Sequence, residues 1–263
     1  MNILFKIIRY QIHDISRSKW LLFYTLFFFL ITYGLISFSN DQSKVILSLL
    51  NVALIIIPLV SIIFGTVYLY NNKDYIVLIL SQPIKRKILY LGLYLGLVIP
   101  LAFSFVIGTL IPLIILGKNI PVQIMLILFL FAAGLFQTSI FVSISFLIAT
   151  WNENKILGLG LSIFTWLLFS VLYDGLLLLM INIFQNYPLE KALIGFSVFN
   201  PVDLARILVI LKLDVAALMG YTGAVFQKFF NTNFGIVVSF LFLIGWTVIP
   251  LMIGKRKFSK KDF

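Results

Sequence analysis

The side chains of this sequence that are able to do chemistry are few and scattered. Cysteine is absent and His13 is the single histidine, which excludes thiol catalysis, cysteine-ligated metal and a histidine-based triad. The five methionines, which suit soft metal ions, are spread from Met1 to Met252 and form no cluster. We therefore predict that the chain is not an enzyme and that it binds no metal or cofactor of its own.

Asp174 is the one ionisable residue inside a long apolar segment. Charged residues at membrane depth mark polar pathways or gates, which makes Asp174 a possible polar gate. The alternative is an aspartate near the outer interface that is bonded to a neighbouring helix. The sequence leaves both interpretations open.

The composition indicates that these residues belong to a membrane protein. Hydrophobic residues make up 62% of the chain and charged residues 11%, whereas a soluble domain carries about a quarter charged residues. Apolar segments of ~20 residues cross a bilayer, and there they must be helical because lipid offers the backbone no hydrogen-bond partners. We predict an all-α polytopic protein with a single transmembrane domain over 1–263. Its six spans are 20–38, 46–70, 88–116, 122–149, 156–183 and 234–254.

The basic residues predict the orientation of these spans. Four of the 20 Lys and Arg lie in 1–19, four in 71–87, one at Lys155 and five in 255–263, and the rest fall in the segments of the other side. Basic residues stay in the cytoplasm, so both termini are expected there. We expect an amphipathic interfacial helix over 1–19 and a solvated basic tail over 255–263. The net charge of +11 is thereby explained by topology, without a nucleic-acid-binding face.

Residues 71–87 form a connection too long for a simple turn. Asp74 suits the first turn of a short helix, and Pro83 should end that helix. The segment between them is apolar but too short to span, so it needs a protein partner to cover it. A re-entrant or interfacial loop of any transporter explains the residues equally well.

Residues 184–233 form the second long connection. Asn200 is a plausible N-cap with Pro201 in the first helical position, and Gly220 is a plausible C-terminal stop. Three charged residues share one helical face: Asp203, Arg206 and Asp214. Each charge would cost ~2.5–3.5 kcal/mol at the bilayer centre, which argues against a seventh span. We expect an amphipathic helix on the outer surface; a structural lid over the bundle is the alternative.

Both connections carry a family resemblance. The acidic residue, Leu-rich helix, Ser-x-Pro and Arg within 71–87 resemble the first cytoplasmic loop of ABC-2-type permeases. Asn200-Pro-Val-Asp-Leu-Ala-Arg206, followed by Asp-Val-Ala-Ala-Leu-Met-Gly-Tyr-Thr-Gly, is similar to the NosY-like permeases of the nitrous oxide reductase maturation system. The resemblance extends over the whole length in span order and spacing, and it is sharpest over about 200–230.

The resemblance implies a homodimer in a bacterial cytoplasmic membrane, with both termini inside. It implies a separate ATPase subunit (NosF-like) that carries ATP and Mg, an external β-helical partner (NosD-like), and copper handled by the wider system for nitrous oxide reductase. Residues implied in ATPase coupling are Asp74, Tyr75, Leu78, Leu80, Gln82, Pro83 and Arg86. Residues implied in binding the external partner are Asn200, Pro201, Asp203, Arg206, Asp214, Met219, Gly220, Tyr221 and Gly223.

Two other functions are weighed against this one. The chain lacks a Gly-x-x-x-x-Gly-Lys-Ser/Thr loop, so ATP hydrolysis has to come from a separate subunit; a generic ABC-2 exporter fits this equally. A self-sufficient secondary transporter or channel needs paired midplane charges or repeated broken helices, and the sequence shows neither. Gly92-x-x-x-Gly96 predicts a close helix contact, for which a dimer seam is one candidate.

Overall fold

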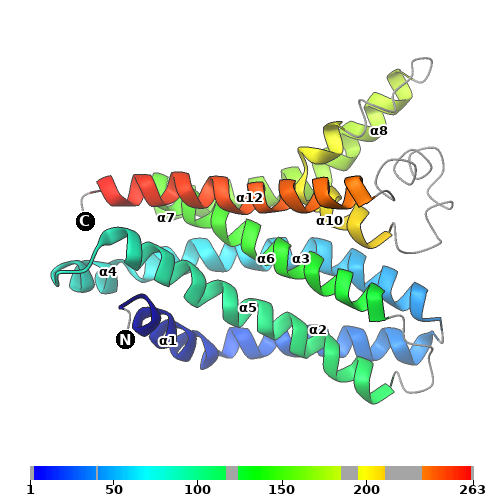
Figure 1. The fold of residues 1–263 in the computed structure, drawn as a ribbon, viewed down its shortest axis with the longest axis horizontal. Coiled ribbons are helices and arrows are strands. Elements are labelled where there is room, and N and C mark those ends of the chain that lie inside the picture. Colours follow the sequence, from blue (N-terminus) through cyan, green and yellow to red (C-terminus); the bar gives the residue numbers. More distant parts are fainter. Residues whose placement is uncertain (1–2, 40, 117–123, 185–194, 211–232, 262–263) are drawn as a thin grey trace.

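The described part of the chain is a bundle of long helices. The computed structural model describes residues 3–39, 41–116, 124–184, 195–210 and 233–261, and these contain helices and no strand. Figure 1 shows the N- and C-termini at the same end of the bundle. We call this end, which also carries α1 (Ile3–Ser16) and α4 (Lys73–Leu80), the terminal end, and the opposite end the far end.

The six predicted spans are confirmed in the described residues as six helices long and apolar enough to cross a membrane. The fifth span is composite, and consists of α7, a π-helical turn and α8. The bounds are α2 (Lys19–Phe38), α3 (Gln42–Asn71), α5 (Arg86–Leu116), α6 (Ile124–Trp151), α7 (Lys155–Leu167), the π turn (Leu168–Leu172), α8 (Tyr173–Ile183) and α12 (Asn233–Lys260). Large apolar side chains on their outer faces, such as Leu30 and Phe103, are exposed as lipid contact requires.

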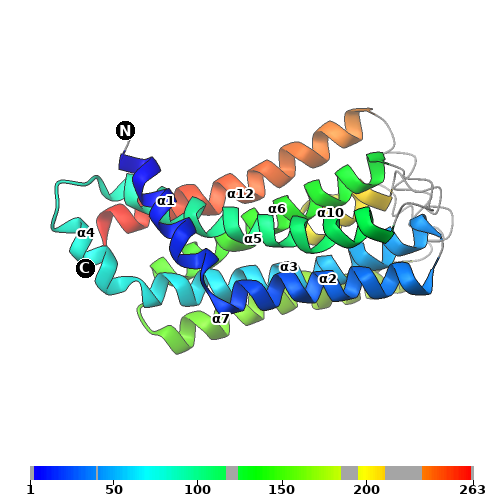
Figure 2. The ribbon, with the colours of Figure 1, turned by 90° about the horizontal axis from the view of Figure 1, so that it is seen from below.

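Small residues let the helices approach closely. α1 crosses α5 obliquely near the terminal end (Figure 2), where Gly92 faces Ile7 and Gly96 faces Gln11. This pair therefore forms an internal contact and is not an open seam for a dimer. Further along α5, a Cβ on Gly108 would lie 2.6 Å from a backbone carbonyl oxygen of α2, so glycine is needed where these two helices meet.

Polar side chains tie the spans together inside the bundle. The hydroxyls of Thr66 and Ser162 lie 2.7 Å apart and join α3 to α7. Tyr94 of α5 donates to the Ser139 carbonyl of α6 at 3.0 Å. Such bonds matter in lipid because the hydrophobic effect does not drive one helix against another there.

The π turn changes the direction of the fifth span. α7 packs against α3, whereas α8 leans away from the bundle toward the far end (Figure 1). A π turn inserts one extra residue into a helix and frequently marks a functional position. The far end of this span therefore stands apart from the helices that hold its other half.

The basic tail expected over 255–263 is not a separate extension in its described part, although its Arg256, Lys257 and Lys260 side chains are exposed as expected. α12 continues through Lys260, and Phe258 is buried against Tyr90 with ring centroids 5.2 Å apart. Lys261 Nζ donates to the Thr150 carbonyl of α6 at 3.2 Å. The described part of this segment therefore continues the last span as a helix, and it contacts the bundle through Phe258 and Lys261.

Candidate functional site

At the terminal end, α4 projects beyond the spans as a short separate helix. Asn72 breaks the helical path after α3, and its amide nitrogen donates to the Tyr68 carbonyl at 2.8 Å, which satisfies one of the last carbonyls of α3. Asp74 lies in the first turn of α4, where its carboxylate is favoured by the helix dipole. The helix ends at Leu80, shortly before Pro83, as predicted.

One face of α4 is anchored to the rest of the chain. Ile76 is 1% exposed, and the ring of Tyr75 stacks on Tyr10 of α1 with centroids 5.6 Å apart. Burial raises the pKa of the Tyr75 hydroxyl, so it stays neutral at physiological pH. These contacts fix the orientation of α4, and Tyr75 acts inside the chain.

The other face of α4 presents apolar side chains outward. Val77 is 48% and Leu78 60% exposed, and Asp74, Gln82 and Pro83 are exposed beside them. This exposed apolar pair, rimmed by polar residues, makes α4 a candidate interaction surface. Val77 was missed from the sequence, because α4 is apolar on several sides and nothing in its pattern shows which residues face inward.

Two of the residues implied in ATPase coupling, Arg86 and Leu80, do not lie on the exposed face of α4. Arg86 Nη1 donates to the carbonyls of Lys261 at 2.6 Å and Ser259 at 3.4 Å. The guanidinium therefore holds the end of α12, whose carbonyls have no helical partner. Leu80 is half-buried. Arg86 links the segment after α4 to the last span.

At the far end, the predicted N-cap of α10 (Pro201–Ile210) is confirmed. Asn200 Oδ1 accepts the Val202 amide at 2.9 Å, and Pro201 takes the first helical position. Asn200 also donates through Nδ2 to the Phe169 carbonyl in the π turn and to Asp203 Oδ2, both at 3.0 Å. One fully buried amide thus caps α10 and clamps it to the fifth span.

A cluster of three charged side chains lies next to this amide. Arg206 Nη1 lies 2.9 Å from Asp174 Oδ2 and 3.3 Å from Asp203 Oδ1. Asp174 is therefore ion-paired with α10. Burial and the nearby Asp174 raise the pKa of the Asp203 carboxyl to about 7, against the lowering effect of Arg206. Two carboxylates share one guanidinium, so a proton on Asp203 relieves the surplus negative charge.

Side chains from three spans hold the chain just before and at the start of α10. Gln137 of α6 donates to the Pro201 carbonyl at 2.7 Å, and Tyr173 of α8 donates to the Phe196 carbonyl at 2.6 Å. Trp246 of α12 donates to the Val198 carbonyl at 3.3 Å. No charge or motif in Gln137 or Trp246 announces this role in the sequence. The segment around Asn200 is therefore held by α6, α8 and α12 at once.

The expectation that this helix lies on the outer surface is wrong for its described residues. α10 packs against α3, α6 and α12, and Pro201, Asn200 and Asp203 are buried. Its charges are accommodated because they pair with one another and with Asp174. The other residues expected to bind an external partner lie outside the described residues: Asp214, Met219, Gly220, Tyr221 and Gly223.

Metal ligands do not gather in the described ranges. No group of three or more His, Asp or Glu side chains able to hold a metal ion occurs there. Asp174, Asp203 and Arg206 form a hydrogen-bonded ion cluster, and the guanidinium occupies the place that a cation would take.

Comparison with known proteins decides the family. Residues 5–263 match the family described as ABC-2 family transporter protein. The chain belongs to this family. Two relatives are each named probable ABC transporter permease protein NosY. The one from Pseudomonas aeruginosa is 24% identical over 236 residues, covering 84% of this chain and 86% of the relative. The one from Stutzerimonas stutzeri is 21% identical over 284 residues, covering 99% of each.

Proposed function

We propose that this chain is the permease subunit of an ABC transporter, and that it couples ATP hydrolysis on a separate subunit to a partner on the opposite side of the membrane. The terminal end faces the cytoplasm, because the segments there carry most of the Lys and Arg. The observation that carries the proposal is the exposed Val77–Leu78 face of α4. It projects on the side where an ATPase subunit would bind, and its anchored opposite face lets it transmit force.

The route for that force runs through contacts already described. α4 continues directly from α3 across Asn72, and α3 packs along α6 and against α7. At the far end the same α6 holds the Pro201 carbonyl through Gln137, and the fifth span holds Asn200 and Arg206. Packed helices move as units and switch between discrete arrangements. We expect a shift of α4 to be passed to α10 through these contacts.

The system served is copper-site maturation of nitrous oxide reductase. This part of the proposal is supported by the NosY names of the two relatives and by the resemblance over 200–230. The partners are then an ATPase of the NosF type, an external β-helical protein of the NosD type, and a second copy of this chain. A generic ABC-2 exporter shares the family and the exposed α4 face, and differs in its external partner.

One experiment tests both the binding of an ATPase subunit to α4 and the role in nitrous oxide reductase maturation. The tagged chain is purified from its native membrane in mild detergent, and its partners are identified by mass spectrometry for wild type, Leu78→Asp and Ile156→Asp. Ile156 is the matched control, because it is 80% exposed at the same end but lies on α7. Losing the burial of one leucine at an interface weakens binding by about tenfold or more.

We expect wild type and I156D to retain an ABC ATPase and an external β-helical protein, and L78D to lose the ATPase. Retention of the ATPase by L78D would refute the assignment of α4. An ATPase without the external partner in wild type would replace the maturation role by a generic exporter. Recovery of neither would favour a self-sufficient transporter.

A further inference from the structure

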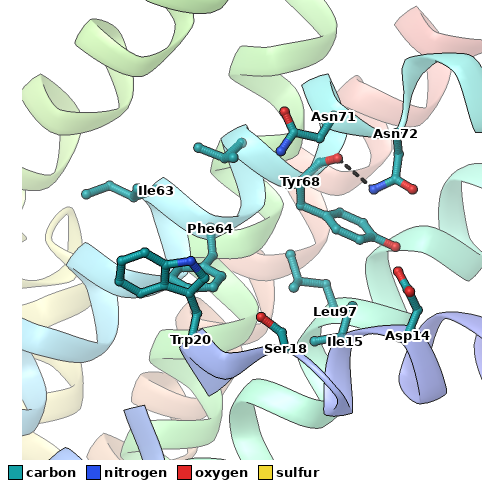
Figure 3. A pocket seen from close by; sticks show the side chains of 11 residues that line it. Asp14, Ile15, Ser18, Trp20, Ile63, Phe64, Tyr68, Asn71, Asn72 and Leu97 are labelled. Carbon is teal, nitrogen blue, oxygen red and sulfur yellow. Dashed lines mark hydrogen bonds between the residues drawn. The ribbon is translucent and has the colours of Figure 1, made fainter. Parts of the chain in front are cut away.

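A cavity of about 640 Å³ opens near the terminal end between the α1–α2 junction and α3. Figure 3 shows its two unlike sides. Asp14, Asn72 and the hydroxyl of Tyr68 lie on one side, whereas Trp20, Phe64 and Ile63 lie on the other. Such a cavity suits an amphiphile that has a polar head and an apolar chain.

The cavity lies at the level of lipid head groups. Part of its lining comes from the junction where α1 ends and the first span begins. Arg17 and Lys19 flank this junction. Trp20 is 67% exposed in the first turn of the span, and tryptophan at this position is typical of the membrane–water interface. An amphiphile in this cavity is therefore drawn from the adjacent leaflet, with its chain remaining among lipid tails.

The charge at the polar side selects the head group. Asp14 is the anionic residue of the lining, and it forms no salt bridge with the described residues. Tyr68 donates its hydroxyl proton to Gln11, so its oxygen keeps lone pairs to accept a further bond. The amide nitrogen of Asn72 is bound to the Tyr68 carbonyl, which leaves its oxygen as an acceptor. These groups are arranged for a cation that donates several hydrogen bonds.

A positive group stands at the rim to receive a phosphate. Lys155 Nζ lies 3.0 Å from Asn71 Oδ1, and Asn71 lines the cavity. A head group that carries a phosphate next to a primary ammonium can therefore place its phosphate at Lys155 and its ammonium at Asp14. A quaternary ammonium has no N–H to give to Asp14 or Tyr68, and an anionic head group without an amine is repelled by Asp14.

We propose that this cavity binds a phospholipid whose head group carries a primary ammonium, with Asp14 as the residue that selects it. Phosphatidylethanolamine has this chemistry. The apolar side formed by Trp20 and Phe64, whose rings lie 6.4 Å apart, takes the start of an acyl chain. A lipid held here fixes the angle between α1 and α3, because it contacts both.

The test is native mass spectrometry of the full chain, purified in detergent with equal amounts of phosphatidylethanolamine, phosphatidylcholine and phosphatidylglycerol. We expect wild type to retain phosphatidylethanolamine about tenfold over phosphatidylcholine, as loss of a charge-assisted hydrogen bond implies. Asp14→Asn should abolish this preference. Asp41→Asn is the matched control: Asp41 is also an exposed aspartate, but it is the N-cap of α3 at the far end.

Three outcomes would overturn the proposal. The first is equal retention of the three lipids by wild type, and the second is an unchanged preference in D14N. The third is full displacement of the lipid by soluble glycerophosphoethanolamine, which would show that the acyl chain contributes nothing. Trp20→Ala provides a separate check, since it should weaken retention of phosphatidylethanolamine while leaving the head-group order intact.

Discussion

Replacing Asn200 should destabilise the far end more than an ordinary N-cap replacement would. Its side chain caps Val202 and also binds the Phe169 carbonyl and Asp203, all without solvent contact. Asn200→Ala removes a cap bond of ~1 kcal/mol and leaves buried polar groups unpaired at ~1–3 kcal/mol, which together cost about 2–4 kcal/mol. The Asn200 side chain is thus expected to contribute to stability mainly by holding α10 against the π turn.

Two further variants separate the clamp from the cap. Asn154 caps α7 through side-chain bonds to the Ile156 and Leu157 amides, and this side chain is exposed. The Tyr70 hydroxyl of α3 donates to the backbone carbonyl of Asn154, which an alanine keeps. Asn154→Ala should therefore cost about 0.5–1 kcal/mol. Asn200→Asp keeps an acceptor for Val202 but loses the donor to Phe169 and places a carboxylate beside Asp203.

The assay is thermal unfolding of the purified chain in detergent, followed by tryptophan fluorescence. We expect the midpoint to fall at least about twofold further for N200A than for N154A, in keeping with the two free-energy costs, and N200D to be no more stable than N200A. Equal shifts for N200A and N154A would refute the clamp. A wild-type midpoint for N200D would show that the cap alone carries the effect.

Two more predictions concern charge and packing. Because the pKa of Asp203 is raised from its ordinary 3.8 to about 7, the folded chain binds an extra proton between these values; stability should fall as pH rises through this window and level off above it. Thermal midpoints measured from pH 4 to 8 should show this fall in wild type and a smaller one in Asp203→Asn, and an identical slope in both would contradict it. Gly108→Ala should destabilise by about 1–3 kcal/mol, because its Cβ would press on the α2 backbone. Gly34→Ala, which meets nothing within 4 Å, is the control and should be neutral or stabilising by up to about 1 kcal/mol; equal losses in a denaturation assay would rule out the close contact.

Local patterns were strong enough to predict several elements. Five of the six spans were placed within four residues of their helices, since lipid forces every long apolar segment into a helix. The sixth was predicted to end at 254, whereas α12 continues to Lys260. The cap at Asn200 and the end of α4 before Pro83 followed from residues that act on their own neighbours in the chain. Family membership was visible for a related reason: the two signature stretches are short and continuous in sequence.

The sequence by itself determined which segments are long and apolar enough to cross the membrane, because that property is local to each segment. Only the tertiary structure decided which of the polar residues face each other. Asp174 and Arg206 are 32 residues apart in the sequence, and Arg206 Nη1 lies 2.9 Å from Asp174 Oδ2, because the π turn and α10 bring the two residues together. α10 was expected on the surface since charges in isolation are costly in an apolar bundle; paired charges are much less so. Phe258 was expected in a solvated basic tail, because the residues around it are Lys and Arg. The structure shows it packed against Tyr90 of α5, while Lys261 donates to the Thr150 carbonyl of α6.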